Sequence, residues 1–260
     1  MNKKTIATAA VTASAATLLA GCANSTSATN APKTVTINYS AAASLQPALT
    51  SIYKTYHEAH PNITIDFDFA GSGAIRQKVL AGAPIDGVFL ASTSDMEKLG
   101  DKVTAESSAL GNELVAVVPA TSTASGSISE LVQKAKKIAI GEPATVPAGM
   151  YASQTLTKLD LTKTAQSKLV EGSDVTQVLS YVAAGNADLG FIYKTDAATN
   201  KNVKIVATVP ASDHAAIIYP LATIKGTNKA ETDATEAFNS YLKSDAAKKV
   251  FEAYKFTIQP

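Results

Sequence analysis

Hydroxyl side chains at the ends of predicted strands are the residues of this sequence best placed to do chemistry. Ser44 follows three alanines, Ser72 stands between two glycines, and Tyr193 ends the apolar run LGFIY. Each offers a neutral hydrogen-bond donor, and a fully ionised oxyanion can only accept hydrogen bonds. A protonated phosphate would also need an acceptor, for which Asp174 is the nearest candidate, although helix capping explains that residue better. The pattern therefore favours a site for a fully ionised oxyanion.

Such a site does not require a cationic side chain. A hydrogen bond to a charged group contributes about 1.5–3 kcal/mol net, so six would total roughly 9–18 kcal/mol. Micromolar affinity needs about 8 kcal/mol, and the remainder can offset ordering and domain closure. The chain has a single arginine, Arg76, one turn into the predicted second helix. Arg76 could stabilise a nearby anion, but the pattern favours a surface or interlobe contact.

Enzymatic chemistry is less well supported. The three histidines are His57, His60 and His214, and none is placed beside a candidate nucleophile, which a serine hydrolase requires. The chain has no P-loop, dinucleotide fingerprint or His/Cys cluster for a transition metal. Two alternatives stay open: a surface hydrolase, which needs a histidine or metal in a cleft, and a surface protein without a transport role, such as an adhesin or sensor.

The predicted elements place the hydroxyls together. Val35, Ile37 and Tyr39 alternate as in a strand, and a helical pattern follows Ser44. A second strand and helix flank Ser72, and strands continue to alternate with helices along the chain. This order predicts an α/β fold with parallel sheets. Ligands in such sheets bind beyond the carboxyl ends of the strands, where the loops at 146–149 and 173–175 would also lie.

Composition limits the class of protein. The chain has 260 residues, 46% of them hydrophobic, and a net charge of +1. Without residues 1–21, which contain Lys3 and Lys4 and no acid, 21 basic and 22 acidic side chains remain, so the net charge is −1. A nearly neutral protein with one arginine is a poor candidate for nucleic-acid binding.

The first residues resemble an export signal. A short basic region precedes an apolar, Ala- and Thr-rich stretch that ends in Leu19-Ala20-Gly21-Cys22. This resembles a bacterial lipoprotein signal, so we expect cleavage after residues 1–21, lipidation of Cys22 and a polar tether over residues 22–33. Cys22 is the only cysteine, so no intrachain disulfide is expected.

A set of short motifs, in order from about Val35 to the C-terminus, carries a family resemblance. With them, the chain resembles the molybdate-binding proteins of bacterial ABC importers. The motifs are AAASL (41–45), GSGAIRQ (71–77), GAPID (82–86), LGNELVAVVP (110–119), GEPATVPAGMYA (141–152), LGFIY (189–193) and YKFTI (254–258).

The resemblance implies a two-lobed α/β fold of the periplasmic-binding-protein type (type II), with mostly parallel sheets flanked by helices. The implied lobes are residues 34–115 plus 211–260, and residues 116–210. It implies capture of molybdate, or tungstate, for an ABC permease by a monomer without cofactor or enzymatic activity, and with no direct ligands to a metal cation. Another tetrahedral oxyanion, sulfate or phosphate, is the alternative ligand. The family's ligand positions fall on Ser44, Ser72, Ala148, Val175 and Tyr193, with Ala148 and Val175 acting through their backbone N–H groups.

Overall fold

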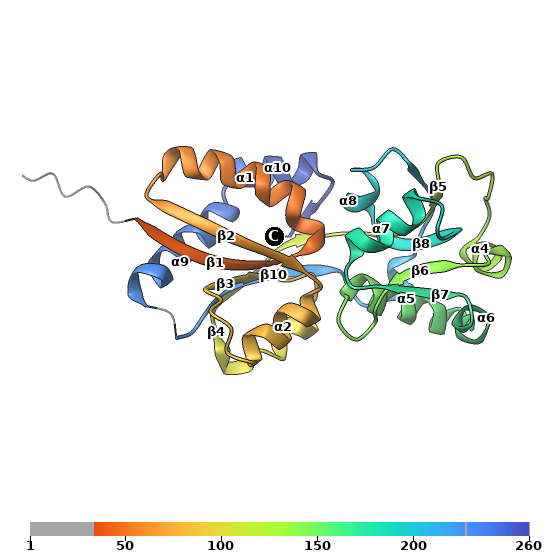
Figure 1. The fold of residues 1–260 in the computed structure, drawn as a ribbon, viewed down its shortest axis with the longest axis horizontal. Helices are drawn as coiled ribbons and strands as arrows, with labels where there is room; N and C mark the ends of the chain where they lie inside the picture. Colours follow the sequence, from red (N-terminus) through yellow and green to blue (C-terminus); the bar gives the residue numbers. More distant parts are fainter. Residues whose placement is uncertain (1–33, 227, 260) are drawn as a thin grey trace, which may run out of the picture. The chain divides into compact units, whose positions relative to one another are not determined.

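The alternation after Thr34 produces β1 (Val35–Ala42), which pairs in parallel with β2 (Ile63–Ala70). The register runs from Val35 opposite Ile63 to Ala42 opposite Ala70. Both strands therefore end at the same edge, and the segments that leave them begin side by side (Figure 1). The computed structural model describes residues 34–226 and 228–259. Residues 34–260 form one compact unit.

These two strands belong to the first of two sheets. Parallel pairing joins β1 to both of its neighbours, while the remaining pairs are antiparallel. In spatial order, the six strands are β11 (Thr257–Ile258), β4 (Val103–Gly111), β10 (Ile218–Ile224), β3 (Gly87–Phe89), β1 and β2.

Helices cover both faces of the first sheet (Figure 1). Both faces of the sheet are apolar and need cover. Successive side chains of a strand point to opposite faces, and the adjacent β3 residues Val88 and Phe89 pack into two different hydrophobic clusters. The Phe89 cluster includes side chains of α1 (Gln46–Ala59), α9 (Lys229–Leu242) and α10 (Asp245–Ala253). The Val88 cluster includes side chains of α2 (Ser72–Leu80) and α3 (Thr93–Glu97).

The second sheet has two parallel and two antiparallel pairings. In spatial order, its strands are β7 (Leu169–Gly172), β6 (Ile138–Gly141), β8 (Leu189–Tyr193), β5 (Leu114–Pro119) and β9 (Val203–Thr208). Helices α5 (Pro147–Lys158) and α7 (Val175–Ala183) lie on opposite faces of this sheet (Figure 1). The sheet also carries α4 (Ile128–Lys134), α6 (Thr162–Gln166) and α8 (Lys194–Ala197).

The chain passes between the sheets twice, from β4 to β5 and from β9 to β10. The predicted α/β class with two helix-flanked sheets is confirmed, but the sheets are mixed rather than mostly parallel. Both strands that follow a passage, β5 and β10, lie antiparallel to all their neighbours. Within the described residues, no helix is both long and apolar enough to cross a bilayer.

Candidate functional site

Ser44 lies in a 3₁₀ turn, Ala43–Leu45, between β1 and α1. Ser44 is inside this turn and does not cap α1, whose N-cap residue is Leu45. Instead, the Ser44 Oγ lies 3.0 Å from the Tyr219 hydroxyl. Ser44 is 4% exposed, so its hydroxyl is held below the surface at the end of β1.

Ser72 takes the matching place after β2, as the first residue of α2. Its backbone N–H has no partner within the helix, as for every first-turn residue. Its Oγ accepts a hydrogen bond from the Ala91 N–H at 2.9 Å. The parallel register of β1 and β2 thus brings the two predicted serines to one edge of the first sheet.

The second sheet contributes two more helix starts. Ala148 is the second residue of α5, after Pro147, and Val175 is the first residue of α7. The predicted capping role of Asp174 is confirmed, because its carboxylate accepts from the Gln177 N–H at 2.9 Å. First-turn N–H groups at Ala148 and Val175 are therefore left to point beyond the helix ends.

Tyr193 ends β8 and is 1% exposed. Its hydroxyl is buried and has no hydrogen-bond partner among the described residues. Burial raises the pKa of Tyr193 well above its usual range, so the phenol stays protonated and can donate. A buried donor without a partner is uncommon in folded proteins, and this hydroxyl is therefore suited to donate to a bound ligand.

One small cavity brings all five residues together. Its volume is about 10 Å³, near the lower limit for one water-sized occupant. None of the twelve described residues that line it is charged. They are Ala42, Ala43, Ser44, Ala70, Gly71, Ser72, Ala91, Val146, Pro147, Ala148, Val175 and Tyr193.

Direct contacts join the two sheets' loops beside this cavity. The Gly73 N–H, in α2, donates to the Thr145 carbonyl, just before α5, at 2.9 Å. A Cβ on Gly73 would lie 2.6 Å from the Thr145 Cα, closer than real side chains come, so this approach requires glycine. From α5, the Tyr151 hydroxyl donates to the Ala91 carbonyl at 3.3 Å.

The chemistry of the cavity is that of an anion site. Hydroxyls and the N-terminal ends of α2, α5 and α7 face it, and helix N-termini combine free N–H groups with the positive end of the helix dipole. No carboxylate lines the cavity among the described residues. The described residues also contain no cluster of His, Cys, Asp and Glu that could hold a metal ion.

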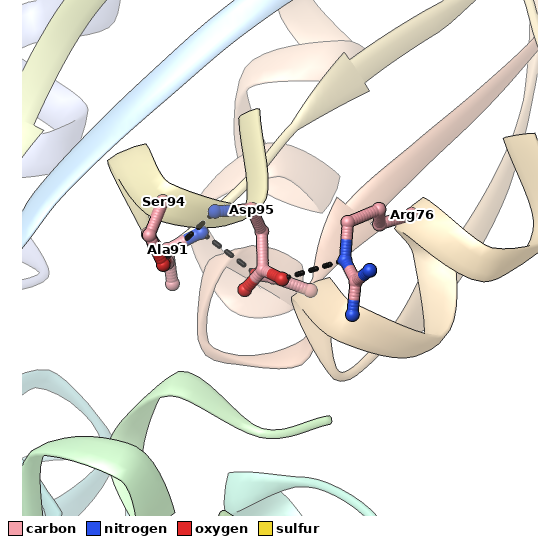
Figure 2. Close-up of polar contacts among 6 residues, drawn as sticks. Arg76, Ala91, Ser94 and Asp95 are labelled. Carbon is pink, nitrogen blue, oxygen red and sulfur yellow. Dashed lines mark hydrogen bonds and ion pairs between the residues drawn. The ribbon is translucent and has the colours of Figure 1, made fainter. Parts of the chain in front are cut away.

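Arg76 does not line the cavity. Its Nε donates to the Asp95 Oδ1 at 2.9 Å, as Figure 2 shows. The prediction of a surface or interlobe contact is therefore wrong, since this largely buried ion pair joins α2 to α3 on one face of the first sheet. No histidine lines the cavity among the described residues either.

Two polar side chains near the site were missed by reasoning from the sequence. Tyr219, in β10, contacts Ser44, and Asn112, just after β4, contacts Tyr219 at 3.1 Å. Asn112 lies in a motif quoted for the family resemblance, but no local pattern marks either residue as polar support for Ser44. The predicted lipidation site, Cys22, lies outside the described residues.

Comparisons with known proteins identify the family of the chain. YvgL of Bacillus subtilis (strain 168), provisionally named as an ABC transporter substrate-binding lipoprotein, is 44% identical over 246 residues, covering 93% of this chain and 94% of the relative. ModA of Haemophilus influenzae, a molybdate-binding protein, is 37% identical over 226 residues, 84% of this chain and 88% of the relative. These matches confirm the expected resemblance.

A solved structure and a family model agree with these relatives. The substrate-binding domain of a provisionally assigned molybdenum ABC transporter from Clostridium difficile superposes with a TM-score of 0.67 at 34% identity, over 87% of this chain and all of that one. The model for bacterial extracellular solute-binding proteins matches residues 37–257. This chain therefore belongs to the family of bacterial extracellular solute-binding proteins.

Proposed function

We propose that this protein binds molybdate, or tungstate, outside the cytoplasm and delivers it to an ABC permease. The observation that carries the proposal is the small uncharged cavity, where buried hydroxyls and helix N-termini converge. Molybdate-binding relatives at 37% and 34% identity support the choice of anion. No cofactor takes part, and the protein is not an enzyme.

Five residues hold the anion in this proposal. Ser44 and Ser72 donate from their hydroxyls and backbone N–H groups, and Tyr193 donates from its phenol. Ala148 and Val175 donate from the first turns of α5 and α7. The burial of all five side chains supports these roles, because hydrogen bonds to an ion strengthen where water is excluded.

The two sheets act as two lobes of a clamp. The lobes are residues 34–115 plus 211–260, and residues 116–210, joined by the two chain passages. Residues 1–21 serve as a signal peptide, and lipidated Cys22 with a tether to residue 33 anchors a monomer to the membrane. Support for this arrangement comes from the two separate sheets and from the lipoprotein name of the Bacillus relative.

Thermal unfolding of residues 34–260 with different anions tests the function. Molybdate, tungstate, sulfate and phosphate are compared at equal ionic strength. A ligand at a thousand times its dissociation constant adds about 4 kcal/mol of stability. At this chain length, that raises the unfolding midpoint by roughly 8–16 °C. We expect the shift with molybdate and tungstate.

The other outcomes separate the alternatives. A shift with sulfate or phosphate alone would keep the binding function and change the ligand. No shift with any of the anions would overturn the proposal. Hydrolysis of generic ester substrates that is lost in Ser72→Ala would favour a hydrolase instead. Tyr254→Phe, a change at the end of α10 far from the cavity residues in the chain, serves as the control and keeps the wild-type shift.

A further inference from the structure

A short chain of hydrogen bonds ends at the hydroxyl of Ser44. The Ser44 Oγ and the Tyr219 hydroxyl lie 3.0 Å apart, and the geometry of this pair alone allows either oxygen to donate. Tyr219 is fully buried and Ser44 nearly so. The direction of this one bond decides whether the Ser44 hydrogen faces the cavity or Tyr219.

The amide of Asn112 sets that direction. The Glu113 N–H, which can only donate, lies 2.9 Å from the Asn112 Oδ1 and identifies that atom as the oxygen. The Nδ2 group of Asn112 must then donate, at 2.9 Å to the Thr195 Oγ1 and at 3.1 Å to the Tyr219 hydroxyl oxygen. Tyr219 therefore accepts a hydrogen bond from Asn112.

Tyr219 still has its own hydrogen to donate. Among the described residues, its hydroxyl has two hydrogen-bond partners, the Asn112 amide and Ser44. The amide offers only hydrogens, so the Tyr219 hydrogen goes to the Ser44 Oγ. The hydrogen of Ser44 is then left for the cavity that Ser44 lines.

Ser72 shows the same arrangement with a simpler partner. Its Oγ accepts from the Ala91 backbone N–H at 2.9 Å, and a backbone N–H cannot act as an acceptor. Both serines thus have an occupied oxygen and a hydrogen free for the ligand. The two serines, both at one edge of the first sheet, reach this result by different means: Ser44 through a side-chain relay and Ser72 through a backbone contact.

We propose that Asn112 and Tyr219 are positioning residues that hold the Ser44 hydroxyl as a donor to the bound anion. This inference rests on the proposed function. With both serines presented as donors, the cavity favours an anion that only accepts hydrogen bonds. A singly protonated phosphate must also donate one, and therefore binds less well.

Two variants change the relay in different ways. Tyr219→Phe removes the hydroxyl but keeps the ring, which packs edge-on against Phe89 and Phe256. Asn112→Asp keeps the size of the side chain but replaces a donor with an acceptor. Tyr219 would then donate to the new carboxylate, and Ser44 would donate to Tyr219 instead of to the ligand.

Titration calorimetry with molybdate tests the relay. We expect Tyr219→Phe to weaken binding by about threefold to tenfold, the range for one neutral hydrogen bond. Asn112→Asp weakens binding further, approaching the loss in Ser44→Ala of about tenfold or more. The double variant Asn112→Asp with Tyr219→Phe keeps the added charge without the reversed relay, and binds molybdate more tightly than Asn112→Asp alone.

Non-additivity with Ser44 separates positioning from general destabilisation. Once Ser44→Ala is present, we expect Tyr219→Phe to change molybdate affinity by less than about twofold, because the relay has nothing left to orient. The preference for molybdate over phosphate, measured where phosphate is mostly the singly protonated dianion, falls in Tyr219→Phe. An equal loss with and without Ser44→Ala, at unchanged preference, would overturn the proposal. Failure of the wild type to bind any anion would instead overturn the proposed function.

Discussion

The hydroxyl of Tyr193 lowers the stability of the ligand-free protein but is expected to strengthen ligand binding. Its hydroxyl is buried without a partner in the described structure, and a buried polar group left unpaired costs about 1–3 kcal/mol. We expect Tyr193→Phe to leave the ligand-free protein as stable as the wild type or slightly more stable. Molybdate affinity falls about tenfold or more, because the lost bond would be made to a charged ligand. Thermal unfolding without ligand and calorimetry with ligand measure the two effects.

Tyr254→Phe is the matched control for that variant. Tyr254 follows α10 and is partly exposed, so the loss of its hydroxyl changes neither quantity. Wild-type molybdate affinity in Tyr193→Phe would remove Tyr193 from the site. A large drop in ligand-free stability would show that the hydroxyl has a structural partner.

The residues that sequence reasoning found are those with a side-chain signal. Ser44, Ser72 and Tyr193 stand out because small neighbours or a strand end expose a hydroxyl, and the structure brings them to one cavity. Ala148 and Val175 came only from the family resemblance, since a backbone N–H leaves no mark in the sequence. Tyr219 was missed because it lies 175 residues from Ser44 in the chain.

The first turn of helix α2 contacts the loop that precedes α5 of the second sheet. The Gly73 N–H donates to the Thr145 carbonyl, and a Cβ at Gly73 would lie 2.6 Å from the Thr145 Cα. We expect Gly73→Ala to lower ligand-free stability, because the clash with the Thr145 backbone outweighs the preference of alanine for helix of about 1 kcal/mol. The loop before α5 cannot then approach α2, so molybdate affinity falls about tenfold or more. Thermal unfolding and calorimetry again separate the two effects.

Gln77→Ala tests whether the effect arises from the contact or from helix propensity. Gln77 is an exposed residue of the same helix, so its replacement raises propensity without touching Thr145. Molybdate affinity equal to that of the wild type is the expected result for this control. If Gly73→Ala also binds normally, contact between α2 and the α5 loop is not needed for tight binding.

At the scale of elements, local patterns predicted the alternation of strands and helices but not the pairing of strands. β4, with the sequence VTAESSALG, combines polar and small residues and shows no clear alternation. It becomes a strand by pairing with β10, more than a hundred residues later in the chain. The mixed character of both sheets likewise depends on where the chain passes between them, which no local pattern records.

At the scale of the whole molecule, the segment between β4 and β5 connects the two sheets through side-chain hydrogen bonds as well as through the backbone. Asn112 lies there and contacts Thr195 of α8 as well as Tyr219 of β10. Asn112 therefore connects Thr195, which follows a strand of the second sheet, to Tyr219 of the first sheet, and Tyr219 in turn contacts Ser44. Next to Thr195, Asp196 is buried, and its Oδ2 has no hydrogen-bond partner among the described residues. Burial raises the pKa of Asp196 from 3.8 to about 7, an effect that backbone hydrogen bonds partly offset.

This buried carboxyl predicts how the stability of the whole protein depends on pH. The unfolded chain releases the Asp196 proton near pH 4, whereas the folded protein keeps it up to about pH 7. Between these values the folded state binds more protons, so stability falls as pH rises. We expect Asp196→Asn to remove that fall and to exceed wild-type stability above pH 7 by up to roughly 4 kcal/mol. Urea unfolding from pH 4 to pH 8 measures the difference, with exposed Asp101→Asn as the control. Parallel stability curves for Asp196→Asn and the wild type would show that Asp196 is ionised in the folded protein throughout.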